Sequence, residues 1–301
     1  MEKEAPGISF YALPEGRRLG GIDLDAQPHE VVMDVAGRFA YVAQYGVPKW
    51  AGPGVGGHRV YIIDLASRQL LRVIDRSPFN RLHGIRLDGQ GRLYVLSESE
   101  SSLIRFDNPA TDLYPSQVIP LGGVRSHYFV IRRDGQRAYI ADSLSGMVIM
   151  ANPFDPVQPP VRHLAGRGPE GCALSLDEQT FYVLNRYDGT LLALDAMTLE
   201  EKRRTDTRGE AVRIITLGDG RLLVSNDTDR SLNLLDPVSL EEQRYLPMPS
   251  PVPGLNLHPE GRLLFAATDD GRIIRVDLER WEILGEFATR AAPDTAVVIR
   301  S

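Results

Sequence analysis

Short stretches of alternating apolar and polar residues recur along the whole chain, and polar turns such as DG, GQG or PEG separate them. This two-residue period is typical of β-strands, and no stretch keeps the 3.6-residue period of a helix for long. The recurring unit is a first strand, a turn, a second strand, a third strand that usually ends near Asp, and a fourth strand. We therefore predict an all-β protein with little helix.

The repeat is regular enough to be aligned by eye. Its first two strands occur in six copies, at residues 28–42, 82–95, 126–140, 169–183, 211–224 and 252–265. Its third strand also occurs in six copies, at residues 59–65, 102–108, 147–153, 190–196, 231–237 and 272–278. A four-stranded unit of about 40 residues is typical of a β-propeller blade, whose faces are buried only when neighbouring blades stack around a ring.

The two ends of the chain carry partial copies of the unit. Residues 8–24 resemble a third and a fourth strand, and residues 293–299 resemble a first strand. We therefore predict a seven-bladed β-propeller with four-stranded blades, in which both termini close the seventh blade and remove an exposed sheet edge. No second strand for that blade is evident, so six blades plus a stub is the alternative. No linker interrupts the repeats, and residues 1–301 are expected to form one domain.

The segments PHEVVMDVAGRFAYV and SHYFVIRRDGQRAYI, followed by strands such as RVYIIDL, carry a family resemblance. The pattern resembles the YVTN-repeat seven-bladed propellers, whose unit runs P-x-G, apolar strand, D-G-x-x-x-Y-V and then a strand ending in I-D. The resemblance covers essentially the whole chain. It implies the propeller fold but is weak for function, because related propellers include lactonases, streptogramin-lyase-like enzymes and proteins without known catalysis.

Composition excludes several classes of protein. The 301 residues are 43% hydrophobic and 25% charged, which is ordinary for a globular protein, and the formal net charge is −6. This acidic balance argues against nucleic acid as a partner. No run of 18 apolar residues is present, so no membrane span is expected, and without a signal-peptide pattern the protein is predicted to be cytoplasmic. The single cysteine, Cys172, lies in an apolar strand and is expected to be a buried, inert thiol.

Three histidines occupy the same register of the repeat, just before or at the start of a first strand. His29, His83, His127 and the equivalent Glu170 follow one another at intervals of 54, 44 and 43 residues, one blade each. First strands line a propeller axis, so these four side chains are predicted to converge at the mouth of the central channel. Three imidazoles and a carboxylate suit a divalent metal ion such as Zn, Fe, Mn or Cu.

A simpler alternative accounts for the same residues. His and Glu are common at this position of YVTN-type repeats, where their side chains can cap strand ends or hydrogen-bond within the channel without any metal. Glu210 and Asp294 lie near the same register and are further candidates for a general base, with Glu170. A solvated strand end is the alternative for both.

Loops that follow second strands are expected to share the mouth with the histidines. Tyr45, Trp50, Arg186 and Tyr187 lie on such loops and are candidate substrate-binding residues, and Trp50 belongs to a long insertion, residues 46–58, that is either a lid or a surface loop. Glu30 follows His29 but is expected to point away from it, because neighbouring side chains alternate in an extended strand.

The main functional prediction is a metal-dependent enzyme that acts on a small molecule at the channel mouth. The ion would act as a Lewis acid while a carboxylate moves a proton, which suits a lyase, an isomerase or a lactone hydrolase; an oxygenase is also compatible. The motifs of zincins, α/β-hydrolases and P-loop NTPases are absent from the sequence. The alternative is a non-catalytic propeller that binds a protein or peptide partner.

Overall fold

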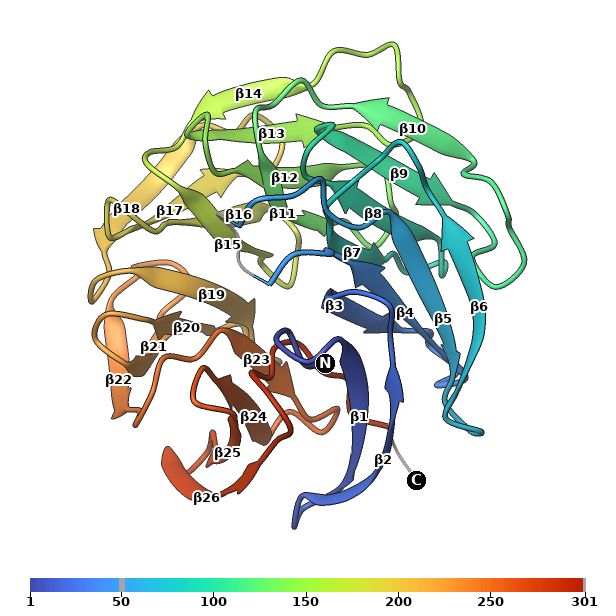
Figure 1. Cartoon of the computed structure of the whole chain (residues 1–301). Coiled ribbons are helices and arrows are strands. Elements are labelled where there is room, and N and C mark those ends of the chain that lie inside the picture. The colour runs from blue at the N-terminus through green and yellow to red at the C-terminus, as the bar shows by residue number, and fades with distance from the viewer. Residues whose placement is uncertain (49–51, 300–301) are drawn as a thin grey trace.

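The structure is a computed structural model that describes residues 1–48 and 52–299. Antiparallel sheets stand around a common centre, and the chain passes from one sheet to the next around the ring (Figure 1). All regular elements among these residues are β-strands, which confirms the β-propeller and the scarcity of helix. Accordingly, none of the described segments is a helix long and apolar enough to cross a bilayer.

Six sheets have four strands each, and we number them blades 1 to 6 in chain order. Blade 1 comprises β3 (Pro28–Met33), β4 (Phe39–Gln44), β5 (Arg59–Asp64) and β6 (Gln69–Asp75), and blade 2 comprises β7 (Leu82–Leu87), β8 (Leu93–Ser97), β9 (Ser102–Phe106) and β10 (Gln117–Pro120). Blade 3 comprises β11 (Ser126–Ile131), β12 (Ala138–Asp142), β13 (Met147–Ala151) and β14 (Val161–Leu164).

The other three blades repeat this plan. Blade 4 comprises β15 (Pro169–Leu174), β16 (Thr180–Asn185), β17 (Thr190–Asp195) and β18 (Glu201–Asp206). Blade 5 comprises β19 (Ala211–Thr216), β20 (Leu222–Asn226), β21 (Ser231–Leu235) and β22 (Glu242–Pro247). Blade 6 comprises β23 (Gly254–Leu257), β24 (Leu263–Thr268), β25 (Arg272–Asp277) and β26 (Glu282–Ala288).

The prediction of seven blades is wrong: the described residues form six four-stranded blades. The N-terminal segment forms only a two-stranded sheet, β1 (Gly7–Ala12) and β2 (Arg17–Asp23), which lies between blades 6 and 1 (Figure 1). The C-terminal residues 293–299 do not form the predicted first strand, because the chain supplies no second strand for them to pair with. The result agrees with the alternative of six blades plus a stub.

The two ends of the chain nevertheless meet and close the ring. Glu2 forms an isolated antiparallel bridge with Pro293, and the Met1 amino group donates to the Thr295 carbonyl oxygen at 3.1 Å. The Asp294 backbone N–H donates in turn to the Met1 carbonyl oxygen at 3.2 Å. These contacts hold Asp294 against the axis.

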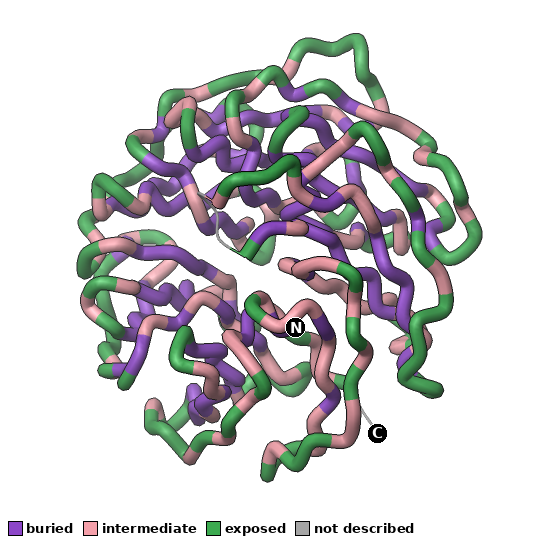
Figure 2. Tube along the Cα trace, in the orientation of Figure 1, coloured by how far each residue is buried: buried purple, intermediate pink, exposed green. Residues whose placement is uncertain are grey.

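Burial follows the order of strands within each blade. The second and third strands are almost wholly buried, whereas the fourth strands are largely exposed, as Figure 2 shows by the green outer rim. The apolar clusters cross from one blade to the next, and one cluster joins Val60 and Ile62 of blade 1 to Ile85 and Val95 of blade 2. Packing between neighbours therefore stabilises the ring, as the repeat predicts.

The first strands approach one another closely and carry irregular registers at their starts. A Cβ atom at Gly171 would lie 2.5 Å from the Val212 carbonyl oxygen of the next blade, so only glycine fits there. Register shifts occur near the first residues of β3, β7, β11, β15 and β19. A bulge breaks the alternation of side chains, so consecutive residues at the axis can both point inward.

Candidate functional site

The structure brings the three predicted histidines together at the propeller axis. His29, His83 and His127 come from the first strands of blades 1, 2 and 3. The ring centroids of His29 and His83 are 3.9 Å apart, and those of His83 and His127 are also 3.9 Å apart. The imidazoles therefore form a stack with His83 in the middle.

His83 is the most unusual member of this stack. Its side chain is fully buried, and neither Nδ1 nor Nε2 has a hydrogen-bond partner among the described residues. Burial, together with the neighbouring His127 and His29, lowers the pKa of His83 well below its usual value, so the ring is neutral. A buried imidazole without hydrogen bonds is costly, and such groups call for an explanation.

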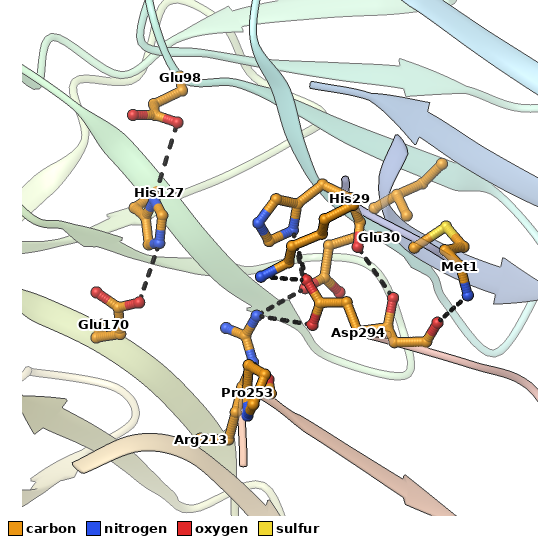
Figure 3. Close-up of polar contacts among 12 residues, drawn as sticks. Met1, His29, Glu30, Glu98, His127, Glu170, Arg213, Pro253 and Asp294 are labelled. Atoms are coloured by element: carbon orange, nitrogen blue, oxygen red, sulfur yellow. Dashed lines mark hydrogen bonds and ion pairs between the residues drawn. The ribbon is translucent and has the colours of Figure 1, made fainter. Parts of the chain in front are cut away.

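His127 lies between two carboxylates, as Figure 3 shows. Its Nε2 is 3.1 Å from Glu170 Oε1, and its Nδ1 is 3.8 Å from Glu98 Oε2. Burial alone would lower the pKa of His127, but Glu170 and Glu98 outweigh it and raise that pKa to about 9. Burial would likewise raise the pKa of Glu170, but His127 and Arg213 bring it down to about 2. The pair is therefore ionised at neutral pH.

At the other end of the stack, His29 contacts Asp294 of the C-terminal segment. His29 Nδ1 lies 3.5 Å from Asp294 Oδ2 (Figure 3). The same oxygen also pairs with Lys3 Nζ at 2.7 Å. Asp294 is almost fully buried. Its ion pairs with Lys3, His29 and Arg213 orient the carboxylate towards the stack rather than towards solvent.

Glu30 corrects one expectation of the sequence analysis. It does not point away from the axis: it is 1% exposed, lies 3.8 Å from His29 Nδ1, and pairs with Arg86 at 3.1 Å and Arg213 at 3.4 Å. The register shift of β3 between Pro28 and Val31 is the reason, because it lets two consecutive side chains face inward. Burial would raise the pKa of Glu30, but Arg86 and Arg213 lower it well below the usual range.

Glu98 was missed by the sequence analysis, although a signal for it exists. It is the residue directly after β8, and it is fully buried beside His127. The equivalent residues after the other five second strands form a ring around the mouth: Tyr45, Ser143, Arg186, Asp227 and Asp269. Aligning these positions, as the first-strand histidines were aligned, would have found Glu98 and Asp227.

Arg186 and Glu210 lie near the axis but outside the histidine stack. Arg186 donates to Glu210 Oε2 at 2.8 Å and to Asp227 Oδ2 at 2.9 Å, so the predicted base Glu210 is engaged in an ion pair. Burial raises the pKa of Asp227 to about 6, against the opposing effect of Arg186. Tyr187 is 47% exposed on the same loop.

Tyr45 packs edge-on against two rings of the histidine stack. Its ring centroid is 5.2 Å from those of both His29 and His83, and it is 2% exposed. Burial and the charge of Glu98 raise its pKa, so it stays a neutral phenol. Trp50, the other aromatic residue proposed for this loop, lies outside the described residues. Cys172 is buried as expected, and burial raises the pKa of its thiol to about 12.

Two cavities lie elsewhere on the molecule. One, of about 500 Å³, is lined by residues of β1, β2 and the segment after β26, including Tyr11, Arg18 and Arg290. The other, of about 330 Å³, lies between blades 3 and 4. Neither is lined by a residue of the histidine stack, whose central member His83 is fully buried, as is the neighbouring Glu98.

Comparisons with known proteins establish the fold. No family model and no curated protein matches the sequence. Among solved structures, a chain of the "Crystal Structure of Mitotic Checkpoint Complex" is similar with a TM-score of 0.73 and 15% identity, over 88% of this chain and 79% of that one. The β-propeller domain of Cps50 (Swd1) from Myceliophteria thermophila is similar with a TM-score of 0.75 and 13% identity, over 91% of this chain and 90% of that one. At these identities the likeness shows a β-propeller and no more.

The comparison corrects the predicted partner. A small-molecule substrate was expected at the mouth, but neither solved propeller supports this expectation, and one of them comes from a structure described as a complex. Lyase and hydrolase activities find no support in these structures. The burial of the histidine stack gives a physical reason for the correction, since a substrate would need access to His83 or Glu98.

Proposed function

We propose that this chain is a non-catalytic β-propeller that binds a protein partner. The single observation that carries this proposal is an open, partly apolar groove between blades 3 and 4. It is the cavity of about 330 Å³ described above, and its lining includes Met150, Val161, Met197 and Arg137. Methionine side chains adapt to the shape of a bound segment, which suits a recognition surface.

Exposed apolar side chains surround this groove. Met197 is 47% exposed, Val161 is 43% exposed, and Val157 on the connection between β13 and β14 is 86% exposed. Large apolar side chains that stay in water are informative when they gather in one place, because they mark interaction sites. The open edge of β14 adds unpaired backbone groups beside them.

The charge in the groove indicates the chemistry of the partner. Arg132 is paired with Asp134 at 3.4 Å, but Arg137 has no carboxylate partner among the described residues and contacts the Met197 sulfur instead. Guanidinium groups at interfaces bind carboxylates with good geometry. The groove therefore suits a segment that carries an apolar side chain next to an acidic one.

The family resemblance is consistent with the propeller scaffold of this proposal. We propose that the repeat is of the YVTN type, on the recurring segments at residues 28–42 and 126–140. Propellers of the YVTN type, like other propellers, expose loops and outer strands around a rigid ring. Such scaffolds commonly bind other proteins.

Affinity purification tests the proposal. Wild-type protein and a Met197→Glu variant would be used to capture partners from the source cells, with Val124→Glu as the matched control. Val124 is 62% exposed on the loop before β11, at the mouth end of blade 3. We expect Met197→Glu to lose a partner that wild type and Val124→Glu retain, and purified partner to bind the wild type at least about tenfold more tightly than the variant. Equal capture by all three proteins would contradict the proposal.

A further inference from the structure

The strongest unexplained feature of the molecule is the buried polar cluster of His83, Glu98 and His127. One ligand atom from each residue can be chosen so that the three atoms lie within 4.8 Å of one another. All three residues are buried. From this geometry we propose that the propeller axis holds one zinc-class divalent ion, bound by His83, Glu98 and His127 between blades 2 and 3.

The unpartnered nitrogens of His83 are the independent observation that points to an ion. Both ring nitrogens are buried and lack a hydrogen-bond partner in the described part of the chain, as does Nδ1 of His127. A metal ion gives the lone pairs of His83 a partner where no donor is present, and an ion bound at His127 Nδ1 takes the place of the proton that the ionised ring holds there. Tetrahedral zinc ligands lie about 3.4 Å from each other, so movements of about an ångström would bring the three atoms together.

The surroundings of His127 match those of a metal ligand. Its Nε2 faces Glu170 at 3.1 Å, while its Nδ1 faces Glu98 across the cluster. Histidines that bind metals usually donate their other ring N–H to a carboxylate, which fixes the tautomer and orients the ring. Glu170 is therefore a positioning residue behind His127, and not the ligand or base that the sequence suggested.

The two carboxylate oxygens of Glu98 face different residues, Arg125 and His127. Oε1 pairs with Arg125 Nε at 2.9 Å, and Oε2 is the oxygen nearest to His127. Oε2 can thus bind the ion while Arg125 keeps the other oxygen. Two imidazoles and one carboxylate suit zinc or a similar ion, whereas magnesium and calcium prefer oxygen ligands alone.

A second group of potential ligands at the axis is less suitable. His29, Glu30 and His83 also place ligand atoms within 4.8 Å of one another. The Glu30 carboxylate, however, is already paired with Arg86 and Arg213. An ion there would have to displace or repel two guanidinium groups, so the cluster at Glu98 is the favoured site.

Bound zinc would link two neighbouring blades. His83 and Glu98 belong to blade 2, and His127 belongs to blade 3. An ion that binds only the folded ring stabilises it by mass action. At a free concentration about 100 times Kd, the melting temperature should rise by about 5–10 °C.

Zinc titration of the full chain tests the site. Protein stripped with a chelator would be titrated with ZnCl2 by calorimetry, and bound metal would be counted by elemental analysis after dialysis. We expect one zinc per chain and no comparable binding of MgCl2. His83→Ala and Glu98→Gln should weaken binding at least about 100-fold, and Glu170→Gln about 10- to 100-fold.

His258→Ala is the matched control, because His258 follows β23 at the far end of blade 6 and its ion-pair partner among the described residues is Glu260. Its zinc affinity should equal that of wild type. Glu98→Gln keeps the shape of the side chain and provides the test if His83→Ala fails to fold. Stoichiometric binding that survives His83→Ala or Glu98→Gln, or the absence of stoichiometric binding to wild type, would overturn the proposal. The groove between blades 3 and 4 takes no part in this assay, so either result leaves partner binding to be judged separately.

Discussion

The two ends of blade 3 show how one repeat can present opposite environments. At the start of β11, His127 is buried among carboxylates and other imidazoles. Just past the end of the same six-residue strand, Arg132 begins the turn that lines the open groove. The first end is closed, polar and dependent on charge compensation, whereas the second is open, partly apolar and adaptable. The difference teaches that the conspicuous polar residues and the accessible surface of this propeller lie at different places.

The closed end and the open groove should differ most in how much stability the protein loses when an arginine is removed. Arg213 is 7% exposed and lies near Glu30 at 3.4 Å and Asp294 at 3.7 Å. Arg213→Met should lower the free energy of unfolding by about 3 kcal/mol, because it removes one cationic partner from each of two buried carboxylates, which then depend on Arg86 at Glu30 and on Lys3 at Asp294. Arg137→Met in the groove should change it by less than about 0.5 kcal/mol. Urea denaturation measures both, and similar losses for the two variants would break the comparison.

A substitution at His83 should show how the stability of the closed end depends on zinc. His83→Leu removes two buried nitrogens that have no hydrogen-bond partner in the described chain and keeps a similar volume. In chelator-treated protein the variant should therefore be more stable than wild type by about 1–2 kcal/mol. With zinc present, wild type should become the more stable of the two. Thermal unfolding with and without ZnCl2 measures this reversal; a variant that is less stable than wild type in both conditions would contradict it.

Asp227 provides a pH test at the mouth end. Its pKa is raised to about 6 by burial, so the folded state favours the protonated form. The contribution of protonated Asp227 to the free energy of unfolding is fully present below about pH 3.8, and it is lost as pH rises through about 6. Asp227→Asn imitates the protonated form and should raise the free energy of unfolding at pH 7 by about 1–2 kcal/mol, and by much less at pH 4. A gain that does not depend on pH would contradict this explanation.

The smallest effect on stability is expected in the groove. Val161→Glu changes a side chain that is 43% exposed at the end of the outermost strand of its blade. The free energy of unfolding should change by no more than about 0.5 kcal/mol, while capture of the partner is lost. Urea denaturation and affinity purification of the same preparation measure the two effects. Loss of folding together with loss of capture would show that the site is structural.

The repeat made much of this architecture predictable. Alternating residues and regular turns predicted the strands, and the shared register of His29, His83 and His127 predicted their convergence, because equivalent positions of adjacent blades must meet at the axis. The seventh blade was predicted wrongly, since a sequence likeness at residues 293–299 does not supply a pairing partner. Strand alternation also misplaced Glu30, because bulges are set by the packing of first strands and not by a local pattern.

Features that depend on several blades at once were harder to predict. Glu98 reaches the histidines only because the residue after β8 lies beside the first strand of the next blade. The groove combines two connections of blade 3 with Met197 of blade 4, which are far apart in sequence and share no motif. The repeat marks the position of Glu98 only when the residues after the second strands are aligned, and it carries no sign of the groove.

Site-specific photo-crosslinking tests most directly whether the open end, and not the closed mouth, receives the partner. A photoreactive phenylalanine derivative would replace Val157 beside the groove or Val124 near the mouth, both of which are well exposed. The account predicts a protein crosslink in the source cells from position 157 that Met197→Glu abolishes, and none from position 124. A crosslink that forms only from position 124 would contradict it.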